Sequence, residues 1–264
     1  MNIVLRELRS NLKSLIIWSG CMATLILIMM MEFEAYYDNP EMAGLLDAMP
    51  QALMKAFSIA GPNLTTLIGF VSIASVYFYI MLGIFAVLLG SSIISKEERD
   101  KTAEFFLTLP ISRTRAISAK LIAAVINCLL LTGVTAAALY SSAAPYNPDQ
   151  EFLRFFRLLM SALFIIQMIF LSTGMCTAAV IKHYKKSGNY SVYTLLTAYI
   201  ISVVISMDNK IDFLKYFTPF KYFEAQYIAA SGELELKYLI ISAVIIIAGF
   251  TGTYLIYPKR DLYI

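Results

Sequence analysis

Charged residues, histidine and cysteine are all scarce in this sequence. Only 15% of the 264 residues are charged and 59% are hydrophobic, whereas a typical soluble domain has about 25% charged residues. The mean hydropathy is +0.71. This balance excludes a typical soluble enzyme, a disordered chain and a disulfide scaffold, and it leaves a polytopic membrane protein as the expected class. The formal net charge of +3 is too small to indicate nucleic-acid binding, and no basic stripe with interleaved aromatic residues supports it.

The three cysteines and the one histidine do not form a recognisable reactive site. Cys21, Cys128 and Cys176 each lie inside an apolar stretch, and no pair has the spacing of metal ligands. We therefore expect buried, unreactive thiols and no metal site. His183 lies among three lysines, a pattern typical of an anchor at the membrane surface. The sequence also lacks a G-x-x-x-x-G-K-S/T loop, so this chain is not expected to hold ATP phosphates in that way.

Charges are absent from six long stretches, each long enough for a helix to cross ~30 Å of hydrocarbon. The uncharged run 56–95 could hold two crossings, but Gly61, Pro62 and Asn63 interrupt it and favour one helix that begins just after them. The sequence therefore predicts an all-α fold with a single membrane domain over 1–264. The six crossings are expected at about 14–31, 64–95, 117–140, 158–181, 188–207 and 238–258.

The basic residues predict which side of the membrane holds the termini. With six crossings, the two termini share one side with the loops after the second and fourth crossings, and that side holds 14 of the 21 lysines and arginines. Because basic residues are enriched in cytoplasmic loops, we expect both termini to be cytoplasmic. Residues 2–13 separate apolar from basic side chains and predict a short amphipathic helix on the cytoplasmic surface.

The predicted crossings contain no charged residue except Lys120, which lies at the cytoplasmic start of the third crossing. This pattern argues against proton pumps, voltage sensors, carboxylate-based ion transport and metal-dependent membrane enzymes. Asn127 and Gln167 are the polar candidates within the crossings. Hydrogen bonding between helices is the simpler explanation for them, and the lining of a substrate pathway is the alternative.

Segment 96–120 is the longest loop on the predicted cytoplasmic side and carries half of the charges assigned to that side. The stretch from Lys96 to Leu109 has helix-forming character, Pro110 would end this helix, and Ser112 can cap the next one. Phenylalanine and leucine residues cluster beside the charged turns. They indicate either a docking surface for a soluble partner or a helix that lies on the lipid headgroups.

This segment, SKEERDKTAEFFLTLPISRTRAISAKLIAA, resembles the cytoplasmic signature of type-2 ATP-binding-cassette (ABC) transporter permeases. It has paired acids, Thr-x-Glu, apolar residues, Pro-Ile-Ser-Arg and a lysine that enters the third crossing. Lys101 departs from the pattern, in which glycine is common at this position. The segment KYFTPFKYFEAQYI at 215–228 is similar to the aromatic, proline-centred segment before the last crossing of these permeases.

The resemblance covers nearly the whole chain and implies a non-catalytic permease subunit of an ATP-driven exporter in a bacterial-type plasma membrane. Its partners would be a second permease subunit, identical or paralogous, and two ABC ATPase subunits that bind ATP and Mg²⁺. Segment 96–112 would couple to the ATPases, with 96–109 as a coupling helix. The implied interface residues are Lys96, Glu97, Glu98, Arg99, Thr102, Glu104, Phe105, Phe106, Leu109, Pro110, Ser112 and Arg113.

The outer segment 208–237 has two interpretations that are compatible with each other. Its aromatic residues around Pro219 are typical of short helices at the membrane interface. The resemblance implies a re-entrant hairpin that covers the outer exit of the pathway. The implied gate residues are Phe217, Pro219, Phe220, Tyr222 and Phe223.

A protein of a different class also fits the sequence. A membrane-resident immunity or binding protein could sequester a peptide or lipid without energy input, through a site in an outer loop. Segment 96–120 would then lie on lipid. An adjacent reading frame with a phosphate-binding loop would favour the exporter.

Overall fold

The computed structural model describes residues 3–37, 39, 63–102, 112–181, 183–207 and 209–259, without the side chains of residues 184, 185, 209, 210 and 212. These ranges are helical and contain no strand. Six of the described helices are long and apolar enough to cross a membrane, which confirms the predicted all-α polytopic fold. The elements are α1 (Ile3–Tyr36), α4 (Leu67–Arg99), α6 (Arg113–Ala143), η1 (Ala144–Tyr146), α7 (Gln150–Val180), α8 (Tyr184–Met207), η2 (Asn209–Phe217), η3 (Pro219–Lys221), α9 (Ala225–Ser231), α10 (Leu236–Ile256) and η4 (Tyr257–Lys259).

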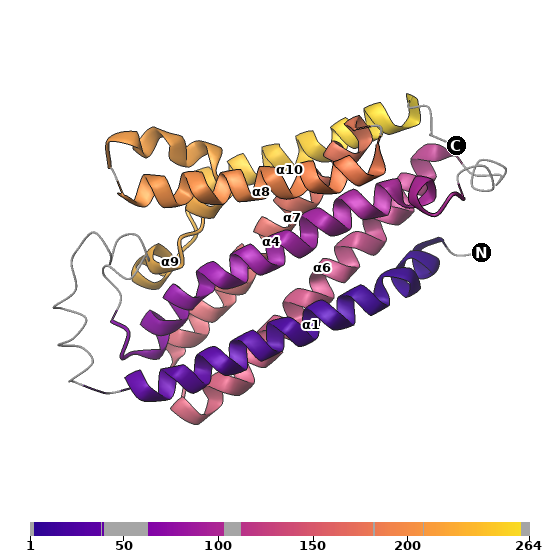
Figure 1. The fold of residues 1–264 in the computed structure, drawn as a ribbon. Coiled ribbons are helices and arrows are strands. Elements are labelled where there is room, and N and C mark those ends of the chain that lie inside the picture. Colours follow the sequence, from indigo (N-terminus) through magenta and orange to yellow (C-terminus); the bar gives the residue numbers. More distant parts are fainter. Residues whose placement is uncertain are drawn as a thin grey trace.

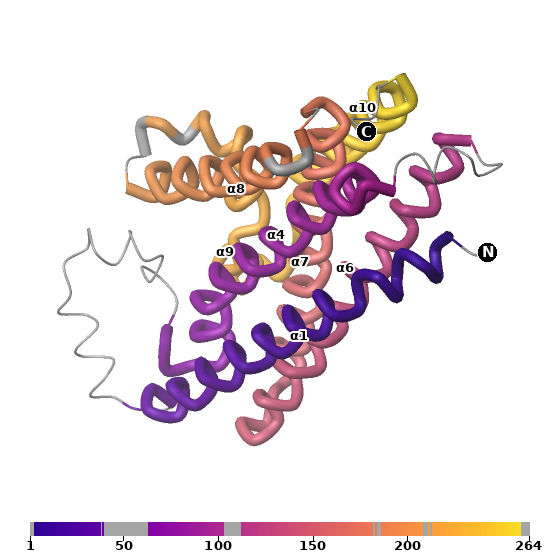
Figure 2. Tube along the Cα trace, turned by 45° about the vertical axis from the view of Figure 1, so that its right-hand side comes forward, coloured from indigo at the N-terminus to yellow at the C-terminus, as the bar shows by residue number. Residues whose placement is uncertain are grey.

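The long helices lie side by side in one elongated bundle (Figures 1 and 2). Helix α1 begins and α10 ends at the same end of this bundle, which we call the terminal end. Helix α4 ends there and α6 begins there, so the two described flanks of segment 96–112 lie at the terminal end (Figure 1). An even number of crossings returns the chain to its starting side, in agreement with this arrangement.

Helix α1 differs from the predicted pair of elements, a surface helix over 2–13 and a crossing over 14–31. The structure has one uninterrupted helix from Ile3 to Tyr36. Its 34 residues span about 51 Å at 1.5 Å per residue, well beyond ~30 Å of hydrocarbon. The amphipathic residues are therefore the first turns of the crossing helix, because no glycine or proline separates the two parts.

Two other helix starts are fixed by side-chain caps. Helix α4 begins just after the predicted interruption, where Thr66 Oγ1 accepts a hydrogen bond from the Gly69 backbone N–H at 3.2 Å. Helix α7 begins at Gln150 rather than at 158, because Asp149 Oδ1 accepts from the Phe152 N–H at 2.7 Å. The charge-free runs thus locate the membrane core of each helix and not its ends.

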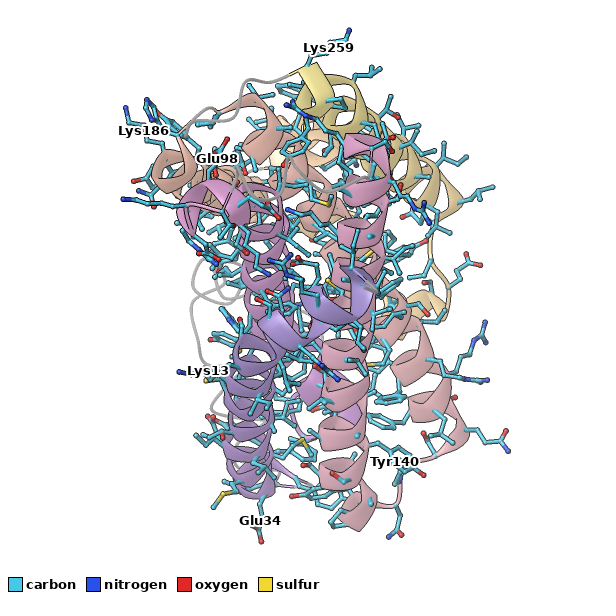
Figure 3. All side chains as sticks on the ribbon, turned by 90° about the vertical axis from the view of Figure 1, so that its right-hand side faces the viewer. Lys13, Glu34, Glu98, Tyr140, Lys186 and Lys259 are labelled. Atoms are coloured by element: carbon cyan, nitrogen blue, oxygen red, sulfur yellow. The ribbon has the colours of Figure 1, made fainter. Side chains whose placement is uncertain are left out.

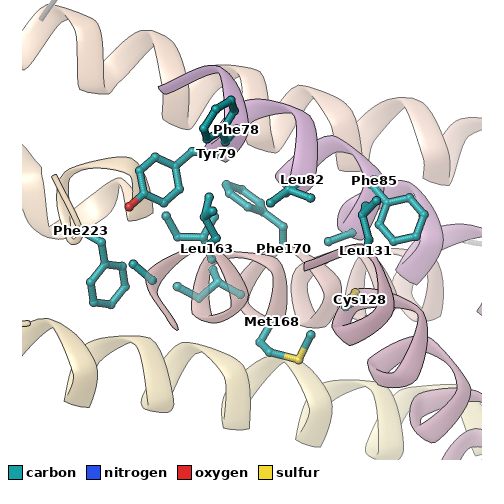
Figure 4. Packing of buried hydrophobic residues seen from close by; sticks show 14 of the residues in the cluster. Phe78, Tyr79, Leu82, Phe85, Cys128, Leu131, Leu163, Met168, Phe170 and Phe223 are labelled. Atoms are coloured by element: carbon teal, nitrogen blue, oxygen red, sulfur yellow. The ribbon is translucent and has the colours of Figure 1, made fainter. Parts of the chain in front are cut away.

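Helices α4 and α7 form the most extensive contact in the bundle. Two glycines permit this contact, since a β-carbon on Gly90 would lie 2.5 Å from the Leu171 carbonyl oxygen, and one on Gly174 would lie 2.4 Å from that of Val87. Small residues commonly allow such close backbone approach between membrane helices. Around this crossing, apolar side chains of α4, α6 and α7 fill the core, among them Phe78, Leu82, Leu131, Leu163 and Phe170 (Figure 4).

The chain between α8 and α10 folds back as a series of short helices. η2 packs against α8, and α9 packs against α4 and α7. Figure 1 shows α9 beside the half of α4 that is farther from the terminal end. This segment therefore fills space among three long helices at the opposite end of the bundle.

Candidate functional site

Two buried ion pairs lie at the terminal end, next to the predicted coupling segment. The first joins Lys120 of α6 to Glu97 of α4, with Nζ 2.5 Å from Oε2. The two side chains are only 1% and 5% exposed. Lys120 Nζ also donates to the Ile93 carbonyl oxygen at 2.6 Å. The buried ammonium group of Lys120 is tolerated because it donates hydrogen bonds to both a carboxylate and a carbonyl oxygen. The pair also fixes the start of α6 against the end of α4.

The second pair joins the start of α1 to the end of α4. Lys96 Nζ lies 2.9 Å from Glu7 Oε2, and Glu7 is buried. Our sequence analysis missed this pair, because 89 positions separate the two residues. One signal was available, since Glu7 is the only acid before Glu32 and lies in an otherwise basic N-terminal segment. Through these two pairs, three helices are connected at the base of the coupling segment.

The predicted coupling helix differs from the structure in its first turn. Lys96, Glu97, Glu98 and Arg99 are the last turn of α4 and not the start of a separate helix. The chain continues helically because Lys96 and Glu97 make the ion pairs just described. Asp100 caps the helix end, and its N–H donates to the Lys96 carbonyl oxygen at 2.9 Å.

The turn after α4 has the geometry of a Schellman motif. Lys101 adopts a left-handed backbone with φ of 54°, and the Thr102 N–H donates to the Glu97 carbonyl oxygen at 2.9 Å. This is the position where the resembling permeases commonly have glycine, which takes up that conformation without strain. Arg99 Nε donates to Asp100 Oδ1 at 2.9 Å, and this bond holds the pKa of the Asp100 carboxyl below its usual value.

Of the remaining predicted coupling residues, five lie outside the described residues and two lie at the start of α6. The five are Glu104, Phe105, Phe106, Leu109 and Pro110. Ser112 caps α6 as predicted, with Oγ accepting from the Arg115 N–H at 3.2 Å. Arg113 Nη1 donates to the Pro258 carbonyl oxygen at 3.0 Å, which links the start of α6 to η4. Figure 3 looks onto this end and labels Glu98, Lys186 and Lys259 from three of the segments that reach it.

The predicted gate residues separate into two groups. Pro219, Phe220, Tyr222 and Phe223 are buried, whereas Phe217 is 72% exposed. The Phe220 ring packs between Phe170 of α7 and Tyr199 of α8, with centroid distances of 5.4 and 5.6 Å. Pro219 thus lies inside the bundle with Phe220, Tyr222 and Phe223, which we call the aromatic wedge, and Phe217 points out of the bundle.

A tyrosine stack closes this wedge against the last helix. The ring of Tyr222 lies 5.2 Å from that of Tyr238 of α10, nearly parallel to it. The Tyr222 hydroxyl donates to the Tyr216 carbonyl oxygen at 2.5 Å. Burial raises the pKa of Tyr222 to about 12, so this hydroxyl keeps its proton and remains a donor near neutral pH.

Both polar candidates of the crossings are buried. Asn127 Nδ2 donates to the Ala123 carbonyl oxygen of its own helix at 2.8 Å. Gln167 Oε1 lies 3.4 Å from Thr132 Oγ1, a contact between α7 and α6. Gln167 therefore makes a contact between helices, as the simpler of the two explanations expects, whereas Asn127 bonds within α6. Within the described part of the chain, no group of three or more His, Cys, Asp or Glu residues could hold a metal ion.

The family comparison agrees with the helical architecture. A family model described as ABC-2 family transporter protein matches residues 1–262. The chain belongs to this family. A comparison with curated proteins finds no significant match. Membership of the ABC-2 family, together with six helices long enough to span a membrane, identifies a multi-pass membrane permease domain. In this ABC-2 domain, the two buried ion pairs connect α1, α4 and α6 at Lys96 and Glu97, where segment 96–112 begins.

Proposed function

We propose that the chain is the permease subunit of an ATP-driven exporter and that it couples to separate ATPase subunits through segment 96–112. The observation that carries this proposal is the pair of buried salt bridges, Glu7–Lys96 and Glu97–Lys120. A force applied to the segment between α4 and α6 would reach α1 and α6 through these bridges, because a buried pair is costly to break.

The proposed assembly contains two permease subunits, identical or paralogous, and two ABC ATPases that bind ATP and Mg²⁺. This chain itself is non-catalytic. It lies in a bacterial-type plasma membrane with both termini cytoplasmic, a placement supported by the excess of basic residues on that side. The buried aromatic wedge of Phe220, Tyr222 and Phe223 would act as the outer gate.

The test is purification of the full chain from its native membranes, followed by mass spectrometry of the intact complex. An ATPase with a phosphate-binding loop is expected to co-purify. Phe105→Asp places a charge in the predicted docking cluster and should reduce both ATPase recovery and permease-dependent ATP hydrolysis at least tenfold. Phe105→Leu, the matched control, should retain both.

Two results would overturn the proposal. One is the absence of any such ATPase from preparations in which the permease is folded. The other is full association and full stimulated hydrolysis with Phe105→Asp. The first result would favour an energy-independent binding or immunity protein.

A further inference from the structure

A cavity of about 250 Å³ lies within the single protomer, between α4, α8, η3 and α9. It adjoins the first turns of α4 and the last turns of α8, and so it lies toward the end opposite the terminal end (Figure 1). Its walls combine apolar side chains with hydroxyl groups. The hydroxyl-bearing residues are Ser72, Ser75, Tyr77, Tyr79, Tyr199, Ser202 and Ser206.

Tyr79 is the key residue of this cavity. Its side chain is only 3% exposed, and its hydroxyl has no hydrogen-bond partner among the described residues. Figure 4 shows the hydroxyl pointing away from the apolar side chains of α7 and towards the segment that carries Phe223. The hydroxyl oxygen itself has almost no surface open to the cavity, so a ligand bonds to it after a small rotation of the Tyr79 side chain. A buried hydroxyl without a partner costs about 1–3 kcal/mol, and a ligand that bonds to it would recover this energy.

The serines complement Tyr79 as acceptors. Ser72 Oγ donates its proton to the Gly69 carbonyl oxygen at 2.7 Å, and Ser202 Oγ donates to that of Tyr199 at 2.6 Å. Their protons are thus occupied, while the oxygen lone pairs remain able to accept. A group that both accepts from Tyr79 and donates to a serine oxygen matches this pattern. Hydroxyl and carboxamide groups have this property.

The size and the charge of the cavity further restrict which ligands can bind. An apolar cavity of about 150 Å³ accommodates benzene, so this larger cavity has room for a ring or short alkyl chain together with a polar group. Ile73, Val76 and Phe220 supply apolar surface. Lys221 and Glu224 at the cavity form an ion pair with each other, which leaves no net charge to attract an ion.

We infer that this cavity binds a neutral amphipathic molecule, or the neutral amphipathic end of a larger one, that presents a hydroxyl or carboxamide to Tyr79. The apolar part of the ligand lies against Ile73, Val76 and Phe220. This site lies inside one protomer, and its occupancy does not depend on ATPase coupling. Failure of the proposed exporter function would therefore leave it intact.

The test uses the full chain in detergent micelles and a photoreactive probe, a diazirine-bearing octanol. Labelling should saturate and map to peptides that contain 72–79 or 199–206. Tyr79→Phe should weaken the apparent affinity for the octanol probe about tenfold, equivalent to one lost hydrogen bond. The corresponding diazirine-bearing octane has no polar group, so its weaker labelling should be the same in both proteins. Tyr140→Phe alters an exposed tyrosine on α6 and should change labelling by neither the octanol probe nor the octane probe.

Separate measurements test whether the variants remain folded. Tyr79→Phe removes a hydroxyl without a partner, so thermal unfolding of the protein should occur at the same or a higher temperature. Val203→Phe fills part of the cavity and should abolish octanol labelling without altering Tyr79. The inference is overturned if octanol and octane label equally, if Tyr79→Phe has no effect on octanol, or if labelling maps elsewhere.

Two sources could supply this chemistry, and native mass spectrometry distinguishes them. A bilayer lipid would co-purify with the protein, and its retention would fall in Tyr79→Phe. A free amphiphile would leave no co-purified lipid, and octanol labelling would be competed by unlabelled alcohol and not by added phospholipid vesicles. Either result supports the site.

Discussion

Lys96 Nζ lies 2.9 Å from Glu7 Oε2 and thereby joins the end of α4 to the start of α1. Both groups are largely removed from water, and Lys96 directly precedes Glu97, which pairs with Lys120. Such pairs add little net stability compared with apolar residues of similar size, but breaking one is expensive. Their effect is to fix the relative positions of three helices at the point where the chain enters segment 96–112.

Breaking the Glu7–Lys96 pair should destabilise the protein. Glu7→Lys or Lys96→Glu leaves a like-charged pair in a buried position, and we expect each to cost about 3 kcal/mol of unfolding free energy. The double variant restores opposite charges and should recover at least half of the summed loss. Thermal unfolding of the purified proteins measures this. If the double variant loses as much unfolding free energy as the two single variants together, the pair does not couple these helices.

Replacing Lys101 with glycine should stabilise the turn after α4. A non-glycine residue in the left-handed conformation costs about 1 kcal/mol, which glycine avoids. Lys101→Gly should therefore raise the unfolding temperature, while Lys101→Ala should not. The matched control is Lys13→Gly, an exposed position inside α1, where glycine should cost about 1 kcal/mol. Equal stabilisation by alanine and glycine at 101 would contradict the backbone explanation.

Alanine at the crossing of α4 and α7 should be poorly tolerated. A β-carbon on Gly90 or Gly174 would overlap a backbone carbonyl oxygen of the facing helix, so the two helices would have to separate. We expect each substitution to lower the unfolding free energy by about 1–3 kcal/mol. Gly20 and Gly133 provide controls on α1 and α6, since a β-carbon there meets nothing within 4 Å. Their alanine variants should unfold at the same or a slightly higher temperature.

The aromatic segment should show a sharp contrast between two neighbouring phenylalanines. Phe220→Ala removes a ring packed between Phe170 and Tyr199 and should cost about 3–5 kcal/mol. Phe217→Ala, at an exposed position, should change the unfolding free energy by no more than about 0.5 kcal/mol. Comparing their transport rates at matched folded amounts then separates gating from stability. Equal destabilisation by the two variants would refute the wedge described above.

Much of the candidate site depended on local patterns and could be predicted. The cap at Ser112 follows from a serine that precedes a helix-forming stretch, and the aromatic residues around Pro219 predicted short helices in this segment. The exposure of Phe217 could not be predicted, because the sequence does not indicate which of several neighbouring aromatic side chains faces outward. The start of the predicted coupling helix was wrong for a similar reason. Charged residues usually end a crossing, but Lys96 and Glu97 find partners on other helices and extend α4.

The sequence by itself determined the six crossings, since burying a charge in hydrocarbon is so costly that the uncharged runs alone locate them. It also determined the helix start near Asn63, which depends on local backbone preferences, whereas it predicted a helix through Lys101 and Thr102, where the structure has a turn. Only the tertiary structure decided which charges pair, which glycines meet and where a cavity with a buried hydroxyl remains. These features join residues far apart in the chain, and their energies depend on packing distances that no local pattern encodes.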